Sequence, residues 1–138
     1  MQWIAAYLSV LVVFGAIDIV WLSVMGSALY KPVLGDLLAP KVRIAPAVAF
    51  YLIYPLGLTI LAVAPALREG SLGRAAFLGA VTGALAYATY DLTNHATLRS
   101  WSIQITLADI AYGAIASAIA AVAAVFIVQT VLGLGSGS

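Results

Sequence analysis

Three aspartates lie inside long apolar stretches of the chain, where charged side chains are rare. Asp18, Asp91 and Asp109 are three of the five acidic residues, whereas all six basic residues fall in the polar segments between these stretches. An aspartate in the middle of a membrane-spanning helix costs roughly 2.5 to 3.5 kcal/mol on insertion scales. We therefore expect the three carboxyl groups to face a shared interior rather than lipid.

Carboxyl groups inside a membrane serve a small set of chemical roles. They bind protons or cations, act as general acids and bases, or join helices through hydrogen bonds. In a poorly hydrated site like charges disfavour each other, so at least one carboxyl of such a network should be protonated. We expect the surrounding polar groups to include Trp21, Tyr51, Tyr54, Tyr87, Asn94, His95 and Tyr112.

The spacing of these residues places them at one depth. Counted from the first and third polar connectors at about 1.5 Å per helical residue, Asp18, Tyr51, Asp91 and Asp109 lie about 10 to 16 Å into the membrane. Four segments thus deliver polar groups to the same half of the bilayer. The spacing predicts a common intramembrane site. If this site binds or translocates a ligand, we expect Asp91 to be the titrating group, with Asp18 and Asp109 as coupled partners and Asn94 as a neutral orienter.

The elements that must position these groups are helices in lipid. Hydrophobic residues make up 64% of the chain and charged residues 8%, and the mean hydropathy is +1.12, beyond what a soluble domain buries. In lipid, backbone groups must be paired within a helix or a closed barrel, and the apolar runs are too long for barrel strands. We expect an all-α membrane domain over residues 1–132, a compact antiparallel bundle of two hairpins. Its four transmembrane helices should cover about residues 3–29, 44–67, 75–95 and 101–132.

Prolines and small residues predict how these helices bend and pack. Pro55 removes a hydrogen bond in the middle of the second stretch, and together with Gly57 it predicts a hinge. A small residue at every fourth position lets two helices approach closely, within one chain or in a homodimer. This spacing occurs at Gly79 and Gly83 and again at Gly113 and Ser117.

Composition argues against several function classes. The chain has no cysteine, which excludes disulfides, thiolate metal sites and cysteine nucleophiles. A net charge of +1 without a dense basic cluster argues against a nucleic-acid partner. His95, near a helix end beside Arg99, is more typical of an interfacial residue than of a ligand, so we expect no metal and no cofactor. The serines lack a nucleophile-elbow context, and an enzyme is the less favoured class.

The connectors and chain ends predict the orientation in the membrane. The first and third connectors carry four basic residues and the middle one carries two. Positive-inside counting therefore places both termini outside, in the periplasm. The first apolar stretch lacks a basic leader, so we expect it to be retained as a helix. Residues 133–138 should form a flexible tail, and their Gly-Ser alternation is typical of a cloning linker.

The segments around the aspartates resemble one protein family. They are residues 18–22, 50–54, 87–98 and 109–113, and Tyr90-Asp91-Leu92-Thr93-Asn94 is their most specific part. The family comprises predicted bacterial inner-membrane proteins known only as a domain of unknown function, and the resemblance covers nearly the whole chain. Tyr112 stands where the family usually has tryptophan before the glycine, so an aromatic is kept. The resemblance implies a bacterial inner-membrane protein with four helices, and it implies no activity.

Three functions remain open from the sequence. The leading hypothesis is binding or translocation of a proton, a cation or a small polar solute, in which Pro55 and Gly57 form a hinge and a homodimer supplies a second half-pathway. The second is a structural or accessory subunit that packs into a larger membrane complex through its Ala- and Gly-rich faces. The third is an intramembrane enzyme acting on a lipid-soluble substrate. The lipid bilayer is a partner in all three.

Overall fold

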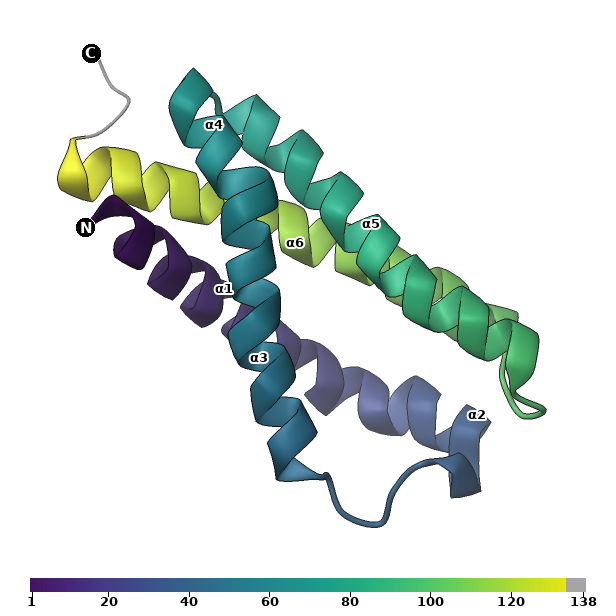
Figure 1. Cartoon of the computed structure of the whole chain (residues 1–138). Coiled ribbons are helices and arrows are strands. Elements are labelled where there is room, and N and C mark those ends of the chain that lie inside the picture. The colour runs from purple at the N-terminus through teal and green to yellow at the C-terminus, as the bar shows by residue number, and fades with distance from the viewer. Residues whose placement is uncertain (134–138) are drawn as a thin grey trace.

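The computed structural model describes residues 1–133, which form long helices joined by short connectors (Figure 1). The first helical rod consists of α1 (Gln2–Met25), a π turn (Gly26–Tyr30), α2 (Lys31–Leu34) and a 3-10 turn (Gly35–Leu37). It therefore runs past residue 29, where the sequence analysis ended the first span. The extension is possible because Pro32 lies in the first turn of α2, directly after the wider π turn, where a missing N–H does little harm.

The second rod contains the proline that was expected to bend it. It consists of α3 (Ile44–Leu58), a π turn (Thr59–Val63) and α4 (Ala64–Glu69). Pro55 lies one turn before the π turn, and its carbonyl accepts a hydrogen bond from the Thr59 hydroxyl at 2.7 Å. The structure thus places a π turn, rather than a break, after Pro55.

The last two rods are single α-helices with well-defined ends. They are α5 (Leu72–Thr97) and α6 (Ile103–Leu132). Gly70 ends the preceding helix with a φ of +63°, a left-handed conformation that favours glycine. Ser71 and Ser102 then act as N-caps, since each hydroxyl accepts the backbone N–H three residues later, at 3.0 and 3.2 Å. Residues 134–138 of the expected tail lie outside the described residues.

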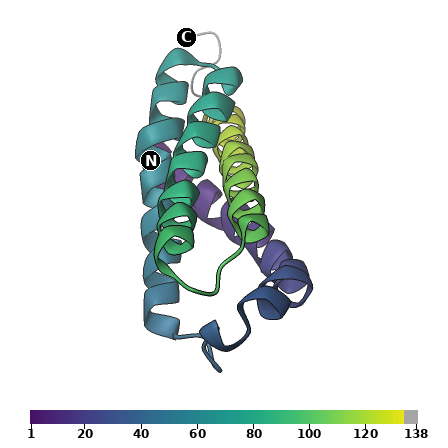
Figure 2. The same ribbon diagram turned by 90° about the vertical axis from the view of Figure 1, so that its right-hand side faces the viewer.

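The four rods form a bundle in which α6 has a central place. Both α5 and α1 pack against α6, and α3 packs against α1 (Figures 1 and 2). The π turn after α3, more than α3 itself, carries the contact of the second rod with α5. The N-terminus lies at the same end as the described end of α6, and the α1–α3 and α5–α6 connectors lie at the opposite end (Figure 1). This is the arrangement that four antiparallel helices require.

Small residues allow α5 and α6 to come unusually close. A Cβ atom added to Gly83 would lie 2.1 Å from the backbone oxygen of Gly113, and one added to Gly79 would lie 2.8 Å from that of Ser117. A Cβ atom added to Gly113 would lie 2.3 Å from the ring of Tyr87. The small-residue spacing found in the sequence therefore lies at a contact within the chain, and this face of α5 is covered by α6.

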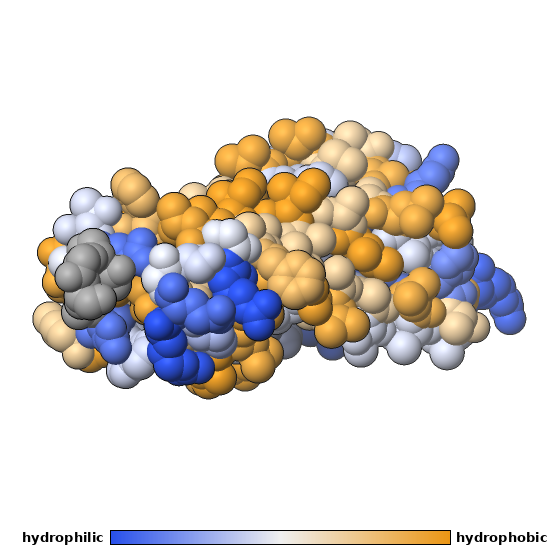
Figure 3. Space-filling model, turned by 90° about the horizontal axis from the view of Figure 1, so that it is seen from above, coloured by the Kyte–Doolittle hydropathy of each residue, from blue (hydrophilic) through white to orange (hydrophobic). Residues whose placement is uncertain are grey.

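The surface and the helix lengths suit a lipid environment. Among residues 1–133, three rods are long and apolar enough to cross a membrane, and they cover residues 2–37, 44–69 and 103–132. α5 has similar length, but its Gly, Thr, Tyr and Asn residues make it less apolar. Because it packs along α6, it shares the depth of that helix. Apolar side chains cover the middle of the face in Figure 3, and hydrophilic side chains gather towards its two ends.

Candidate functional site

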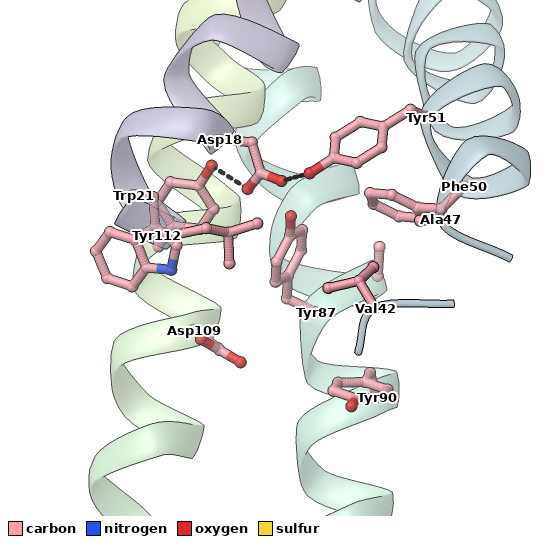
Figure 4. A pocket seen from close by; sticks show the side chains of 12 residues that line it. Asp18, Trp21, Val42, Ala47, Phe50, Tyr51, Tyr87, Tyr90, Asp109 and Tyr112 are labelled. Atoms are coloured by element: carbon pink, nitrogen blue, oxygen red, sulfur yellow. Dashed lines mark hydrogen bonds between the residues drawn. The ribbon is translucent and has the colours of Figure 1, made fainter. Parts of the chain in front are cut away.

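Asp18 is buried on α1 and is held by two tyrosines from other helices. It is 6% exposed. Tyr112 on α6 donates its hydroxyl to one carboxylate oxygen at 2.6 Å, and Tyr51 on α3 donates to the other (Figure 4). Both oxygens are thereby satisfied, and one carboxylate ties three helices together.

Asp109 on α6 is the end of a second hydrogen-bonded chain. Its carboxylate is 7% exposed and accepts the hydroxyl of Tyr30, which lies in the π turn after α1. The Tyr30 oxygen in turn accepts the indole N–H of Trp21 at 2.9 Å. The Trp21 ring stacks on Tyr112, with centroids 4.2 Å apart, so the two chains of hydrogen bonds lie side by side.

Asp91 on α5 differs from the other two aspartates. It is fully buried, and neither of its carboxyl oxygens has a hydrogen-bond donor among residues 1–133. Its carboxyl lies within hydrogen-bonding reach of the Asp109 carboxyl across the contact between α5 and α6. A buried polar group without a partner is costly, so this pair needs a proton or a cation to satisfy it.

A cavity of about 570 Å³ lies between the four rods in the half of the molecule that holds the aspartates. Asp18 and Asp109 supply its carboxylates, and aromatic rings form much of the remaining wall (Figure 4). None of its lining residues, all within the described part of the chain, is Lys or Arg. The lining residues are Asp18, Trp21, Leu22, Val42, Ala47, Phe50, Tyr51, Ala86, Tyr87, Tyr90, Asp109 and Tyr112.

The remaining residues expected at the site are only partly brought together. Tyr87 lines the cavity, whereas Tyr54 lies deeper and its hydroxyl is 2.7 Å from that of Ser117. Asn94 is half-buried and is absent from the cavity lining. His95 Nδ1 lies 3.3 Å from the Thr106 hydroxyl, towards the end of the helices.

The two expected hinge residues lie away from this cavity. Pro55 is buried within the second rod. Gly57 lines a second, more open cavity of about 400 Å³ between α3 and α5, together with Tyr54 and Thr82. Ala86 lines both cavities, so they lie on neighbouring parts of the same helix, α5.

Tyr30 belongs to the hydrogen-bonded cluster around Asp109 but was not among the residues expected from the sequence. In the sequence it precedes Lys31-Pro32, just beyond the expected end of the first span, a position typical of an aromatic residue at the membrane interface. In a regular α-helix its separation of nine residues from Trp21 is about two and a half turns, which places the two side chains on opposite faces. The π turn shifts the register and returns Tyr30 to the side of Trp21 and Asp109. Gly26-Ser27 within an apolar helix was the available signal for such an irregular turn.

The comparisons with known proteins identify the family. A family model described as predicted membrane protein (DUF2177), a domain of unknown function, matches residues 3–126. The chain belongs to this family. The match confirms the family of unknown function expected from the sequence and, with the apolar rods, the all-helical membrane fold. No curated protein and no solved structure matches the chain.

The site geometry limits the chemistry that it can support. No group of three or more His, Cys, Asp or Glu side chains among residues 1–133 is arranged to hold a metal ion. Each carboxylate oxygen of Asp18 already accepts a hydroxyl, whereas among residues 1–133 neither oxygen of Asp91, beside Asp109, has a hydrogen-bond donor. Negative charge surrounded by aromatic rings favours a cationic ligand over a neutral or anionic one.

Proposed function

We propose that this chain is a membrane protein that binds a small organic cation in the cavity between its four rods. The observation that carries this proposal is the cavity wall, which combines two buried carboxylates with aromatic rings and, among its described residues, has no basic side chain. A cation over a Trp or Tyr ring gains roughly 0.5 to 2 kcal/mol, and a nearby carboxylate adds a Coulombic attraction that is strong where water is excluded.

The size and lining of the cavity support an organic cation rather than a metal ion. Its volume of about 570 Å³ falls within the range of small-molecule sites. Calcium and magnesium sites are usually built around carboxylates, and residues 1–133 contain no group of three or more Asp, Glu, His or Cys side chains placed to hold a metal ion. Apolar walls would instead contact the hydrocarbon part of an organic ligand, and the carboxylates would face its charge.

We further propose that the chain resides in the bacterial inner membrane with both termini in the periplasm. The support is the distribution of basic residues: four lie at the cavity end, in α2 and the two connectors there, and two lie in the helix ends beside the turn at the opposite end. Short connectors rich in Lys and Arg tend to stay in the cytoplasm. The cavity would then lie in the cytoplasmic half of the bilayer.

The test of binding uses two probes of nearly the same shape and opposite charge. Thermal unfolding of the detergent-purified chain is measured with tetraphenylphosphonium and with tetraphenylborate. We expect saturable stabilisation by the cation alone, reaching about 2.7 kcal/mol when the probe is at one hundred times its dissociation constant. We expect Asp109→Asn to weaken the affinity at least tenfold, because it removes a cavity carboxylate.

Asp36→Asn is the matched control, since it also removes one carboxylate but lies in the exposed 3-10 turn. It should bind like the wild type. Equal stabilisation by both ions would indicate nonspecific partitioning and contradict the proposal. A wild type that neither ion stabilises, with Asp109→Asn as stable as the wild type, would favour the accessory-subunit alternative.

A further inference from the structure

We propose that Asp91 and Asp109 together hold one proton, and that a cation entering the cavity displaces it, so that binding exchanges one positive charge for another. This inference rests on the proposed function, because it concerns how the same cavity balances its charge. It adds proton coupling to cation binding and assigns the coupling to Asp91, which does not itself line the cavity.

The surroundings of Asp91 require a proton in the empty site. The side chain is fully buried, and its oxygens meet no donor among residues 1–133. An ionised carboxylate in that position would have neither solvent nor a hydrogen bond. A neutral carboxyl group, in contrast, can donate its O–H to the adjacent Asp109 carboxylate, which satisfies both side chains.

The pairing of the two aspartates follows from the register of α5 on α6. Each step of four residues along α5 corresponds to a step of about four residues in the opposite direction along α6. The contacts that define this ladder are Gly79 with Ala121, Gly83 with Ser117, Tyr87 with Gly113, and His95 with Thr106. Asp91 and Asp109 occupy the remaining step, between Tyr87 and His95. Because glycines bring the two backbones together, the carboxyls have little freedom to separate.

Among residues 1–133, neither carboxyl of this pair forms an ion pair with Lys or Arg. The titratable groups that face it are Tyr87 and His95 from α5, Tyr112 from α6, and Asp18 and Tyr30 from the first rod. All six Lys and Arg residues of the chain are exposed and lie in the connectors or within the helical turns next to them. In the empty site the second negative charge of the pair is therefore removed by a proton rather than by Lys or Arg.

The two carboxyls have different roles in the exchange: Asp109 contacts the cation, and Asp91 releases the proton. Asp109 faces the cavity and Asp91 lies behind it. A cation beside Asp109 stabilises negative charge on both carboxyls, so the O–H bond of Asp91 breaks and its proton leaves for water. His95 and Thr106 lie one turn further towards the connector and provide hydrogen-bonding groups on the way out. The net charge of the site is the same before and after the exchange.

The first measurement examines the proton without any ligand. Infrared spectroscopy of the detergent-purified chain at neutral pH should show the carbonyl stretch of a protonated carboxylic acid. The band should be lost in Asp91→Asn, which keeps the volume of the side chain and can still donate to Asp109, and retained in Asp36→Asn. A wild type without the band would overturn the inference, and this result requires no variant to fold.

The second measurement follows proton release during binding. In weakly buffered solution, tetraphenylphosphonium should release about one proton per bound cation, and its affinity should rise about tenfold per pH unit while the pair is protonated. Asp91→Asn should bind the cation without proton release and without this pH dependence. Asp36→Asn should behave like the wild type.

The outcomes separate the two proposals. Saturable cation binding without proton release, or equal release by wild type and Asp91→Asn, would overturn the exchange and leave the proposed function standing. Failure of the wild type to bind the cation would overturn the proposed function, and the exchange would fall with it even if the infrared band were present. Binding with proton release that depends on Asp91 would support both.

Discussion

Asp18 shows how a single residue can be accommodated inside a membrane. Two tyrosine hydroxyls satisfy its oxygens, and each comes from a different helix. Removing the hydroxyl in Tyr112→Phe leaves the ring and its stacking on Trp21 intact but deprives the buried carboxylate of a donor. We expect the free energy of unfolding in detergent to fall by about 1 to 3 kcal/mol.

Tyr90→Phe is the control for this prediction, because Tyr90 lines the same cavity but is 61% exposed. It should change stability by less than about 0.5 kcal/mol. The loss caused by Tyr112→Phe should also shrink in an Asp18→Asn background, where no charge is left without a donor. Equal losses in both backgrounds would show that the hydroxyl acts elsewhere.

At the residue scale, the sequence indicated which polar side chains lie at a common level along the helices, but not the hydrogen bonds between them. Counting along straight helices brought Asp18, Tyr51 and Asp109 to one level, and all three line the cavity. It could not detect Tyr30, because a π turn changes the face on which that side chain lies. Nor could it show that Asp91 lies behind the cavity wall, since this depends on the close approach of α5 to α6.

At the scale of elements, the contact between α5 and α6 depends on the absence of side chains. A methyl group at Gly83 would overlap the Gly113 carbonyl and the Ser117 hydroxyl, so the helices would have to separate. We expect Gly83→Ala to lower the free energy of unfolding by about 1 to 3 kcal/mol, as overpacked sites do. Thermal unfolding in detergent measures this loss.

Gly15→Ala is the matched control within α1. A Cβ atom there meets nothing within 4 Å. The substitution should be neutral or stabilise the chain by up to about 1 kcal/mol, because alanine favours a helix more than glycine does. If both variants unfolded at the wild-type temperature, the close contact between α5 and α6 would not limit stability.

The sequence predicted these helices better than it predicted their partners. Their apolar runs marked the elements, because this signal is local. The spacing of Gly79 and Gly83 indicated a close contact but was compatible with a homodimer as well as with a neighbour in the chain. Only the fold shows that α6 covers this face.

At the scale of the whole molecule, the cavity exists because the second rod does not follow α5 along its full length. The π turn after α3 contacts α5, whereas α3 itself contacts α1 and its first half is largely exposed, which leaves space beside Phe50 and Tyr87. No local sequence pattern encodes this separation, since it depends on where the other three rods pack on α6. The cavity could therefore not be predicted from the sequence, whereas Asp18 and Asp109, which supply its carboxylates, were identified as candidate site residues.

The orientation of the molecule decides from which side a ligand or proton reaches that cavity. The chain has no cysteine, so single cysteines can be introduced and labelled with a membrane-impermeant maleimide in intact cells. Asp36→Cys lies in the first connector, at the cavity end, and Gly73→Cys lies beside the middle turn, where a Cβ atom makes only an ordinary contact. We expect Gly73→Cys to be labelled in intact cells and Asp36→Cys to be labelled only after permeabilisation, because short connectors rich in Lys and Arg tend to stay in the cytoplasm. The reverse pattern would place the cavity in the periplasmic half of the membrane, and the proton released from Asp91 would then leave on that side.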